Sequence, residues 1–475
     1  MTFNLLKWGV VVTDKKAGGM RVKDLRAQRI SLQQKWLWRF NKEEGPLWRN
    51  IFINHNKIWF TKPLDHQTSS TCGSSYSQHM WYSEAIENSL GFFHPLFTIE
   101  IGNGEVYTVT CSPTDASLVA TGGGDDTVFM WKIGQGDFAF ELQGSLRYGA
   151  GYGDSVSSLA FSTDGQLLAS GSLDGLIRVW DITSGSPTGT LEGPEMGIEW
   201  VRWHPRGHVV LAGSEDSSVW MWNTDSSAFM NTFLGHAGSV TCGGFTPDGK
   251  LICTGSDDAT LRIWDPKSAQ SIHVVRGQPY HTEGLTCLTI SLDSTLALTG
   301  SKDGSAHIVN IITGKVVTSL SVHTDSIECD SFSARHKFFG KSLPTIAWIC
   351  SSFEMENRMK DENKGVPLNE NEFGLKRSMD NKLVIWDLQQ YLPRSICEHE
   401  EGVTCLLWLG QCRYVATGCV DGQVRIWDSR SGECVKTFNG HTEAIQSLAA
   451  SSNGEYLVSV SMDKTARVFE ISELN

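Results

Sequence analysis

The sequence lacks several features that mark common classes of protein. No apolar run approaches the ~18 residues of a membrane-spanning helix, so we predict no transmembrane segment. The first residues, MTFNLLKWGVVVTDKK, include Lys7 and have no small-residue cleavage site, so we predict no signal peptide. The 12 cysteines include no CxxC pair, which favours buried, reduced thiols over a disulfide or zinc framework. These absences predict a cytoplasmic protein that also reaches the nucleus.

Basic residues are scarce in most of the chain. The formal net charge is −13, from 40 Lys and Arg and 53 Asp and Glu. Residues 1–95 hold 13 basic and 7 acidic residues, whereas residues 96–475 hold 27 and 46. Hydrophobic residues make up 40% of the chain, enough to bury a core. The chain therefore combines a basic leader with a strongly acidic globular part.

One phrase recurs along the acidic part. Small residues and an Asp are followed by alternating apolar positions that end at a closing residue. The closing residues are Trp131, Trp180, Trp222, Trp264, Val309, Trp386, Trp427 and Phe469. Six positions before them stand Asp125, Asp174, Asp216, Asp258, Asp303, Asp380, Asp421 and Asp463. Eight matches in eight copies indicate an internal repeat rather than chance composition.

The period of the repeat predicts the architecture. Successive closing residues are 49, 42, 42, 45, 77, 41 and 42 positions apart, which resembles the ~40–45-residue period of WD40 blades with four strands each. Apolar residues one and three positions before each closing residue are typical of a strand. A second apolar position, here called the inner-strand landmark, begins the innermost strand of a blade. It lies 18 residues before the Asp in six copies, as Val156, Ile198, Val240, Leu285, Val403 and Ile445.

The polar residues that recur in each repeat have a structural role in WD40 blades. There a His, a hydroxyl, the Asp and the Trp form a buried hydrogen-bonded chain. Two copies carry the whole set, namely His236, Thr254, Asp258 and Trp264, and His399, Thr417, Asp421 and Trp427. A hydrolase triad also combines His, a hydroxyl and Asp, but repetition around a ring favours a structural role. We therefore predict no enzyme activity, no catalytic residue, no metal site and no cofactor.

The ends of the repeat region indicate how the ring closes. The eighth copy stops one strand short, and PLFTIEI at 95–101 reads as the missing outer strand. We predict an all-β, eight-bladed WD40 propeller over 95–475, closed by strand 95–101 in the last blade. It follows a small appendage that is partly helical or disordered. The 77-residue step contains an irregular insertion at about 334–378, which we expect to replace the second strand of blade six.

The leader divides into two parts. Residues 8–51 contain GGMRVKDL and KWLWRF, and resemble the region that follows the reverse transcriptase domain of plant non-LTR retrotransposons. No paired Asp for metal-bound polymerisation is present there, so the resemblance implies no polymerase activity. We assign 1–68 to this basic segment and 69–94 to a Ser-rich linker. Nucleic acid is disfavoured as a partner, apart from weak binding by this segment.

Acidic residues recur beside the inner-strand landmarks and the Asp turns. Because both kinds of loop lie at one end of the blades, they predict a ring of carboxylates on one face. The candidate partner-binding residues are Glu105, Asp154, Glu195, Glu215, Asp257, Glu283, Asp325, Glu400, Glu401 and Glu443. Such a surface attracts cationic partners and repels phosphate. The alternative is that these loops are simply polar and exposed.

The repeats also resemble one WD40 family. GEVYTVTCSPTDASLVATGGGDD, GIEWVRWHPRGHVVLAGSEDS and YHTEGLTCLTISLDSTLALTGSKDGS are similar to the angio-associated migratory cell protein family in its plant form. Fungal relatives act as chaperones of a basic large-subunit ribosomal protein. The resemblance thus implies a non-catalytic, monomeric scaffold or chaperone for a basic client during ribosome biogenesis, with no membrane partner.

Two further functions remain open. The segment Asp421–Arg430 (DGQVRIWDSR) fits the end of the WDxR box with which substrate receptors dock the adaptor of a cullin-RING ubiquitin ligase. One copy is a weak signal, because RIWD also belongs to the repeat. A general signalling scaffold is the other alternative.

Overall fold

The computed structural model describes residues 92–93, 95–101, 104–134, 138–143, 155–320, 323, 325–332, 345–350, 381–388, 391–410 and 413–474. Within these ranges the regular structure is β-strand, followed by one 3-10 turn, η3 (Ser472–Leu474). No α-helix occurs in the described ranges, and none there could cross a membrane. The leader, including the retrotransposon-like segment, the linker and the predicted partly helical appendage, lies outside them up to residue 91.

The strands form eight antiparallel sheets of four strands, one of which gains a fifth. Three sheets take their strands from β3 (Val106–Cys111), β4 (Leu118–Gly123), β5 (Thr127–Lys132), β6 (Phe138–Gln143); β7 (Val156–Phe161), β8 (Leu167–Ser172), β9 (Ile177–Asp181), β10 (Pro187–Leu191); and β11 (Ile198–Trp203), β12 (Val209–Ser214), β13 (Ser218–Asn223), β14 (Ala228–Leu234). Two more take β15 (Cys242–Phe245), β16 (Ile252–Gly255), β17 (Leu261–Trp264), β18 (Ser271–Val275); and β19 (Leu285–Ile290), β20 (Leu296–Ser301), β21 (Ala306–Asn310), β22 (Lys315–Leu320).

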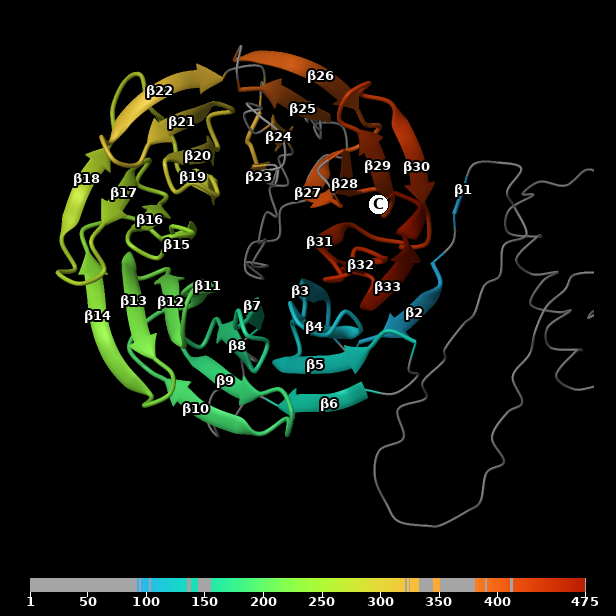
Figure 1. Cartoon of the computed structure of the whole chain (residues 1–475), viewed down its shortest axis with the longest axis horizontal. Helices are drawn as coiled ribbons and strands as arrows, with labels where there is room; N and C mark the ends of the chain where they lie inside the picture. Colours follow the sequence, from blue (N-terminus) through green and yellow to red (C-terminus); the bar gives the residue numbers. More distant parts are fainter. Residues whose placement is uncertain are drawn as a thin grey trace, which may run out of the picture. The chain divides into compact units, whose positions relative to one another are not determined.

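The remaining sheets complete the ring. The sixth contains β23 (Cys329–Phe332), β24 (Thr345–Cys350), β25 (Lys382–Asp387) and β26 (Leu392–Glu398). The seventh contains β27 (Val403–Leu409), β28 (Tyr414–Cys419), β29 (Val424–Asp428) and β30 (Cys434–Phe438). The eighth contains β31 (Ile445–Ala450), β32 (Tyr456–Ser461) and β33 (Thr465–Glu470). Each first strand packs against the first strand of the next sheet, and β31 packs against β3, so the sheets close on themselves (Figure 1).

Burial follows the position of a strand within its sheet. Second strands such as β12 and β32 are buried at nearly every residue, because neighbouring sheets cover both faces. Outer strands such as β22 alternate between exposed and covered residues. The core therefore consists of several apolar clusters between adjacent sheets, each containing one closing residue of the repeat, which is Val309 in one cluster and Trp or Phe in the others.

A strand from before the first sheet completes the eighth. The strand β2 (Phe97–Glu100) pairs antiparallel with β33, with Phe97 opposite Val468. The Ile101 N–H donates to the carbonyl of Lys464 at 2.9 Å. The closing strand predicted at 95–101 is thus observed as β2. A further strand, β1 (Phe92–Phe93), pairs parallel with the outer strand β30 and was not foreseen.

The predicted fold class requires correction at the sixth sheet. We expected eight WD40 blades, the sixth irregular, with an insertion at about 334–378 in place of its second strand. Instead, β24 lies inside that range and pairs with both β23 and β25. Its residues, TIAWIC, do not carry the repeat pattern, so this sheet is irregular. Seven sheets are built from segments of regular spacing.

Candidate functional site

The antiparallel order of each sheet places two kinds of loop on one face of the ring, here called the loop face. The loop before the first strand and the turn between the second and third strands lie at the same end. Direct contacts join them: the Ser301 hydroxyl donates to the Glu283 carbonyl at 3.0 Å, and the Ser461 hydroxyl donates to the Glu443 carbonyl at 2.9 Å. The predicted acidic residues occupy these loops.

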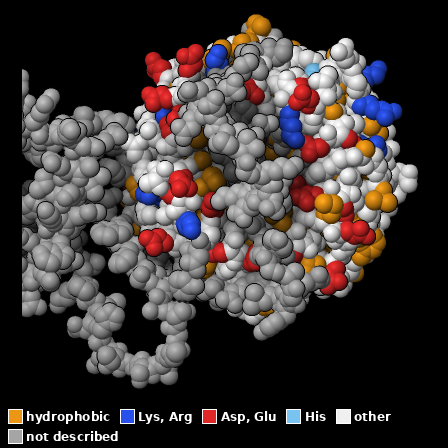
Figure 2. All heavy atoms as spheres, turned by 180° about the vertical axis from the view of Figure 1, so that it is seen from behind, with side chains coloured by type: hydrophobic (Ala, Val, Ile, Leu, Met, Phe, Trp, Pro, Cys, Tyr) orange, Lys and Arg blue, Asp and Glu red, His pale blue; other side chains and the backbone are white. Residues whose placement is uncertain are grey.

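Most of the predicted carboxylates are accessible. Half-buried members are Glu105, Glu215 and Asp325, and exposed members are Glu195, Asp257, Glu283, Glu400, Glu401 and Glu443. Asp154, like the structural Asp380, lies outside the described residues. On the face of the ring that Figure 2 shows, Asp and Glu side chains are more frequent than Lys and Arg side chains (Figure 2). The charge available to a partner is therefore negative.

Two carboxylates beside this ring were missed from the sequence. Glu199 and Glu328 are half-buried and follow the inner-strand landmarks Ile198 and Ile327 directly. Burial raises the pKa of Glu199, and the charges of Glu215 and Asp257 raise it further. These residues therefore lie near enough to interact electrostatically. The sequence signal that was missed is an acidic residue directly after a landmark. The residue at that position begins the inner strand and lies at the loop face.

A single lysine accompanies this group. Lys302 Nζ lies 2.8 Å from a carboxylate oxygen of Asp257, and its charge lowers the pKa of both Glu199 and Glu328 against the larger effect of burial. We call Glu199, Glu215, Asp257, Asp325 and Glu328 the acidic arc, which spans the third to the sixth sheets. Five carboxylates against one ammonium leave the arc with excess negative charge.

In the second, fourth, fifth and seventh sheets the position after the landmark carries a hydroxyl that joins adjacent sheets. Thr241 donates to the Leu285 carbonyl at 2.6 Å, and Thr404 donates to the Ile445 carbonyl at 2.5 Å. Ser157 and Thr286 make the same contact with the landmark carbonyl of the next sheet. We call these contacts inter-sheet latches. At Glu199 and Glu328 a carboxylate replaces the hydroxyl. In the third sheet the Trp200 indole N–H donates to the Val240 landmark carbonyl at 2.9 Å instead.

The predicted structural chain is complete in the fourth sheet. His236 Nδ1 lies 3.1 Å from Asp258 Oδ2, and His236 Nε2 lies 2.8 Å from the Thr254 hydroxyl. The Trp264 indole N–H donates to the same hydroxyl at 2.8 Å. Burial alone would raise the pKa of Asp258, but hydrogen bonds from His236 and Thr260 outweigh it and lower this pKa. The set is buried in a turn, which fits a structural role.

The second predicted chain differs at its aspartate. Thr417 contacts His399 at 3.0 Å and accepts the Trp427 indole N–H at 3.1 Å, as expected. Asp421, however, pairs with Arg425 at 2.5 Å, and no contact between Asp421 and His399 is seen among the described residues. The arginine lies four residues further on, and its guanidinium competes with the imidazole for the carboxylate.

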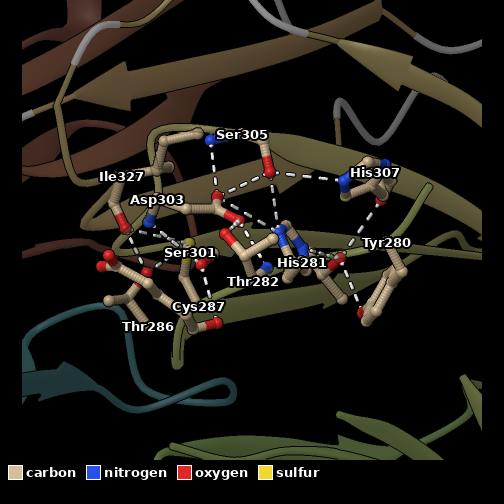
Figure 3. Close-up of polar contacts among 12 residues, drawn as sticks. Tyr280, His281, Thr282, Thr286, Cys287, Ser301, Asp303, Ser305, His307 and Ile327 are labelled. Atoms are coloured by element: carbon tan, nitrogen blue, oxygen red, sulfur yellow. Dashed lines mark hydrogen bonds and ion pairs between the residues drawn. The ribbon is translucent and has the colours of Figure 1, made fainter. Parts of the chain in front are cut away.

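The fifth sheet has a polar chain that the sequence did not reveal, because its closing residue is Val309 (Figure 3). His281 contacts the Thr299 and Ser305 hydroxyls, each at 2.9 Å. The Tyr280 hydroxyl donates to Thr299 at 3.0 Å and takes the place of the missing indole. Among the described residues, no group of His, Cys, Asp and Glu has an arrangement that could hold a metal ion.

Comparison with known proteins places this fold in a class. The WD domain, G-beta repeat family matches seven segments of the chain, at 93–132, 142–181, 185–223, 227–265, 270–310, 391–428 and 432–470. The chain is therefore a WD40 repeat protein. The matches pass over most of the irregular sixth sheet, so the prediction of eight WD40 blades is corrected to seven.

The similarity to individual proteins is more specific. The human angio-associated migratory cell protein is 34% identical over 372 residues, covering 78% of this chain and 79% of its own. The dog protein of the same name is 34% identical over 380 residues, with the same coverage. The chain belongs to the angio-associated migratory cell protein family.

Solved structures share the fold. Sqt1 of Chaetomium thermophilum, bound to the N-terminus of the ribosomal protein L10, is 22% identical with a TM-score of 0.63, covering 78% of this chain and 97% of that one. A second structure of Sqt1 is 21% identical with a TM-score of 0.65, covering 82% and 100%. The computationally designed Ika8 protein is 19% identical with a TM-score of 0.61, covering 80% and 99%.

Proposed function

We propose that the chain is a non-catalytic scaffold or chaperone whose loop face binds a basic protein segment. The observation that carries this proposal is the acidic arc, in which five carboxylates from the third, fourth and sixth sheets combine with a single lysine, Lys302 of the fifth. Converging charge of one sign raises the local concentration of an oppositely charged partner and speeds its capture. The raised pKa of Glu199 also indicates a site where a cation would relieve repulsion.

The client that we favour is a ribosomal protein of the large subunit. Support comes from the structure of Sqt1, which has a similar fold and is bound to the N-terminus of ribosomal protein L10. The excess of acidic over basic residues in 96–475 agrees with a cationic client. We propose that the protein acts as a monomer in the cytoplasm and also in the nucleus, where such clients are assembled.

The test is binding of a fluorescent Lys- and Arg-rich peptide, measured by anisotropy at several salt concentrations. The triple variant Glu283→Lys, Glu401→Lys and Glu443→Lys reverses exposed charges on the loop face. We expect at least about tenfold weaker binding and a smaller dependence on salt, because fewer opposite charges meet across the interface.

A matched control keeps the net charge of that variant. Glu433→Lys, Glu455→Lys and Glu470→Lys alter exposed residues at the opposite ends of the strands, after β29, before β32 and at the end of β33. This variant should bind within about threefold of the unchanged protein. Equal losses in the two variants would show that net charge, not the loop face, governs binding.

The ubiquitin-ligase alternative gains no specific support. Within DGQVRIWDSR, Asp428 is buried, accepts the Arg430 backbone N–H at 2.8 Å and pairs with Arg413, so it stabilises its own turn. Arg430 is exposed and remains the residue to test. Loss of adaptor co-precipitation on Arg430→Ala would favour that function over the chaperone.

A further inference from the structure

Buried polar atoms without hydrogen-bond partners concentrate in the sixth sheet. Within the part of the chain that the structure describes, they include both carboxylate oxygens of Asp330, the side-chain oxygen of Asn381 and the indole nitrogen of Trp386. A buried polar atom that lacks a partner loses its hydration without compensation, which destabilises the packed state. The sixth sheet therefore carries an energetic penalty that its neighbours largely avoid.

The register of β24 explains why the Trp386 indole N–H has no acceptor. In the fourth sheet, the Trp264 N–H finds its acceptor in Thr254, two residues from the tryptophan's partner on the second strand. In the sixth sheet, the position equivalent to Thr254 is occupied by Trp348, which pairs with Val384. Tryptophan has no hydroxyl, so the acceptor that Thr254 provides in the fourth sheet has no counterpart at this position, and the Trp386 indole nitrogen has no partner.

The position of Asp330 is apolar in the neighbouring sheets. Counted from the landmark, its equivalents are Leu288 in β19 and Leu406 in β27. Asp330 is 8% exposed and lies on β23, which packs against β19. Burial raises the pKa of Asp330 well above its usual range, although the Cys287 thiol acts in the opposite direction. A polar carboxyl group thus takes the place of a leucine where two sheets meet.

The sixth sheet also lacks a latch toward the seventh. Its residue after the landmark is Glu328, which as a carboxylate has no hydrogen to donate to the Val403 carbonyl. Its carboxylate instead accepts the hydroxyl of Ser326 at 2.8 Å. Among the described residues, no side chain of the sixth sheet is seen to donate to the Val403 carbonyl. The Trp408 indole of the seventh sheet donates to the Ser331 carbonyl at 3.4 Å, and Thr286 of the fifth sheet latches to the Ile327 carbonyl. Among the described residues, the sixth sheet is therefore latched toward the fifth sheet but not toward the seventh.

We infer that the sixth sheet is the unit of the ring that opens locally most often. The buried polar atoms without partners destabilise the sheet only while it is packed, because local opening returns the Asp330 carboxyl and the Trp386 indole to water. The other sheets, where fewer buried polar atoms of the described residues lack partners, remain closed. The ring then has one weak sector beside the acidic arc rather than uniform stability. This inference stands whether or not the loop face binds a basic client.

Hydrogen exchange of the full-length protein, followed by mass spectrometry, tests the inference. Amides of β23, β25 and β26 should exchange at least about tenfold faster than those of β19, β21 and β22. Asp330→Leu restores the residue type of the neighbouring sheets and should slow exchange of the sixth sheet about tenfold, while other sheets stay unchanged.

A reciprocal variant serves as the control. Leu406→Asp places a carboxyl at the equivalent position of the seventh sheet and should speed exchange of β27 to β30. If that variant fails to fold, Asp330→Leu alone decides the matter. Equal exchange in the fifth and sixth sheets, or an Asp330→Leu variant with unchanged exchange, would overturn the inference.

Discussion

At the scale of single residues, the hydroxyl at the centre of each polar chain has the largest structural effect. Thr254 is fully buried and serves two partners, His236 at 2.8 Å and Trp264 at 2.8 Å. Removing it leaves an imidazole nitrogen and an indole N–H buried without partners. Such a loss exceeds that of one ordinary hydrogen bond, because unsatisfied groups keep their desolvation penalty.

We expect Thr254→Val, which keeps the shape of the side chain, to lower the free energy of unfolding by about 2–3 kcal/mol. The measurement is the midpoint of urea unfolding followed by tryptophan fluorescence. Thr190→Val on the outer strand β10 is the control, since Thr190 is exposed. It should change stability by less than about 0.5 kcal/mol. A Thr254→Val protein as stable as this control would contradict the structural role.

The same residues show what could be read from the sequence. The set in the fourth sheet follows from the spacing of His236, Thr254, Asp258 and Trp264. The contact between Asp421 and Arg425 could not be foreseen. Whether the Asp421 carboxylate pairs with His399 or with Arg425 depends on the geometry of the turn. Glu199 was missed because its position carries hydroxyls in most other sheets.

At the scale of elements, the strands differ in how firmly the repeat determines them. The closing strand β2 was predictable, because the eighth copy ends one strand short and PLFTIEI has strand character. The strand β24 was not predicted, because TIAWIC, although apolar, lies in an insertion that does not carry the spacing of the repeat. Pairing with β23 and β25 imposes strand structure there, which is a tertiary effect that no local pattern reports.

The closing strand should contribute strongly to stability. It pairs with β33, buries Ile101 and brings Thr98 to the Arg467 guanidinium at 3.2 Å. We expect a chain that begins at residue 104 to melt at least about 10 °C below one that begins at residue 91, because β33 becomes an exposed edge. Differential scanning calorimetry of the two chains measures this. Equal melting temperatures would show that β2 is dispensable for closure.

At the scale of the whole molecule, neutral histidines are spread around the ring. Burial lowers the pKa of His236 in the fourth sheet and of His441 in the eighth, and burial together with the Arg425 charge lowers the pKa of His399 to about 4. At the surface, hydrogen bonds that His208 donates to Asp164 and Asp225 raise its pKa. The buried and the surface histidines therefore respond to acid in opposite directions.

Acid should destabilise the protein before its carboxylates titrate. Between pH 6.5 and 4 the unfolded chain protonates His399 while the folded chain does not, so stability is full above pH 6.5 and falls as the pH falls. For His399 alone the loss approaches about 3 kcal/mol. Urea unfolding at several pH values should show a shallower fall of the free energy of unfolding with falling pH for His399→Gln.

His208→Gln should instead steepen this fall. The raised pKa of His208 in the folded chain adds stability in acid, and that stability is lost as the pH rises. Two variants with the same pH profile as the unchanged chain would show that proton uptake by histidine does not control its acid stability.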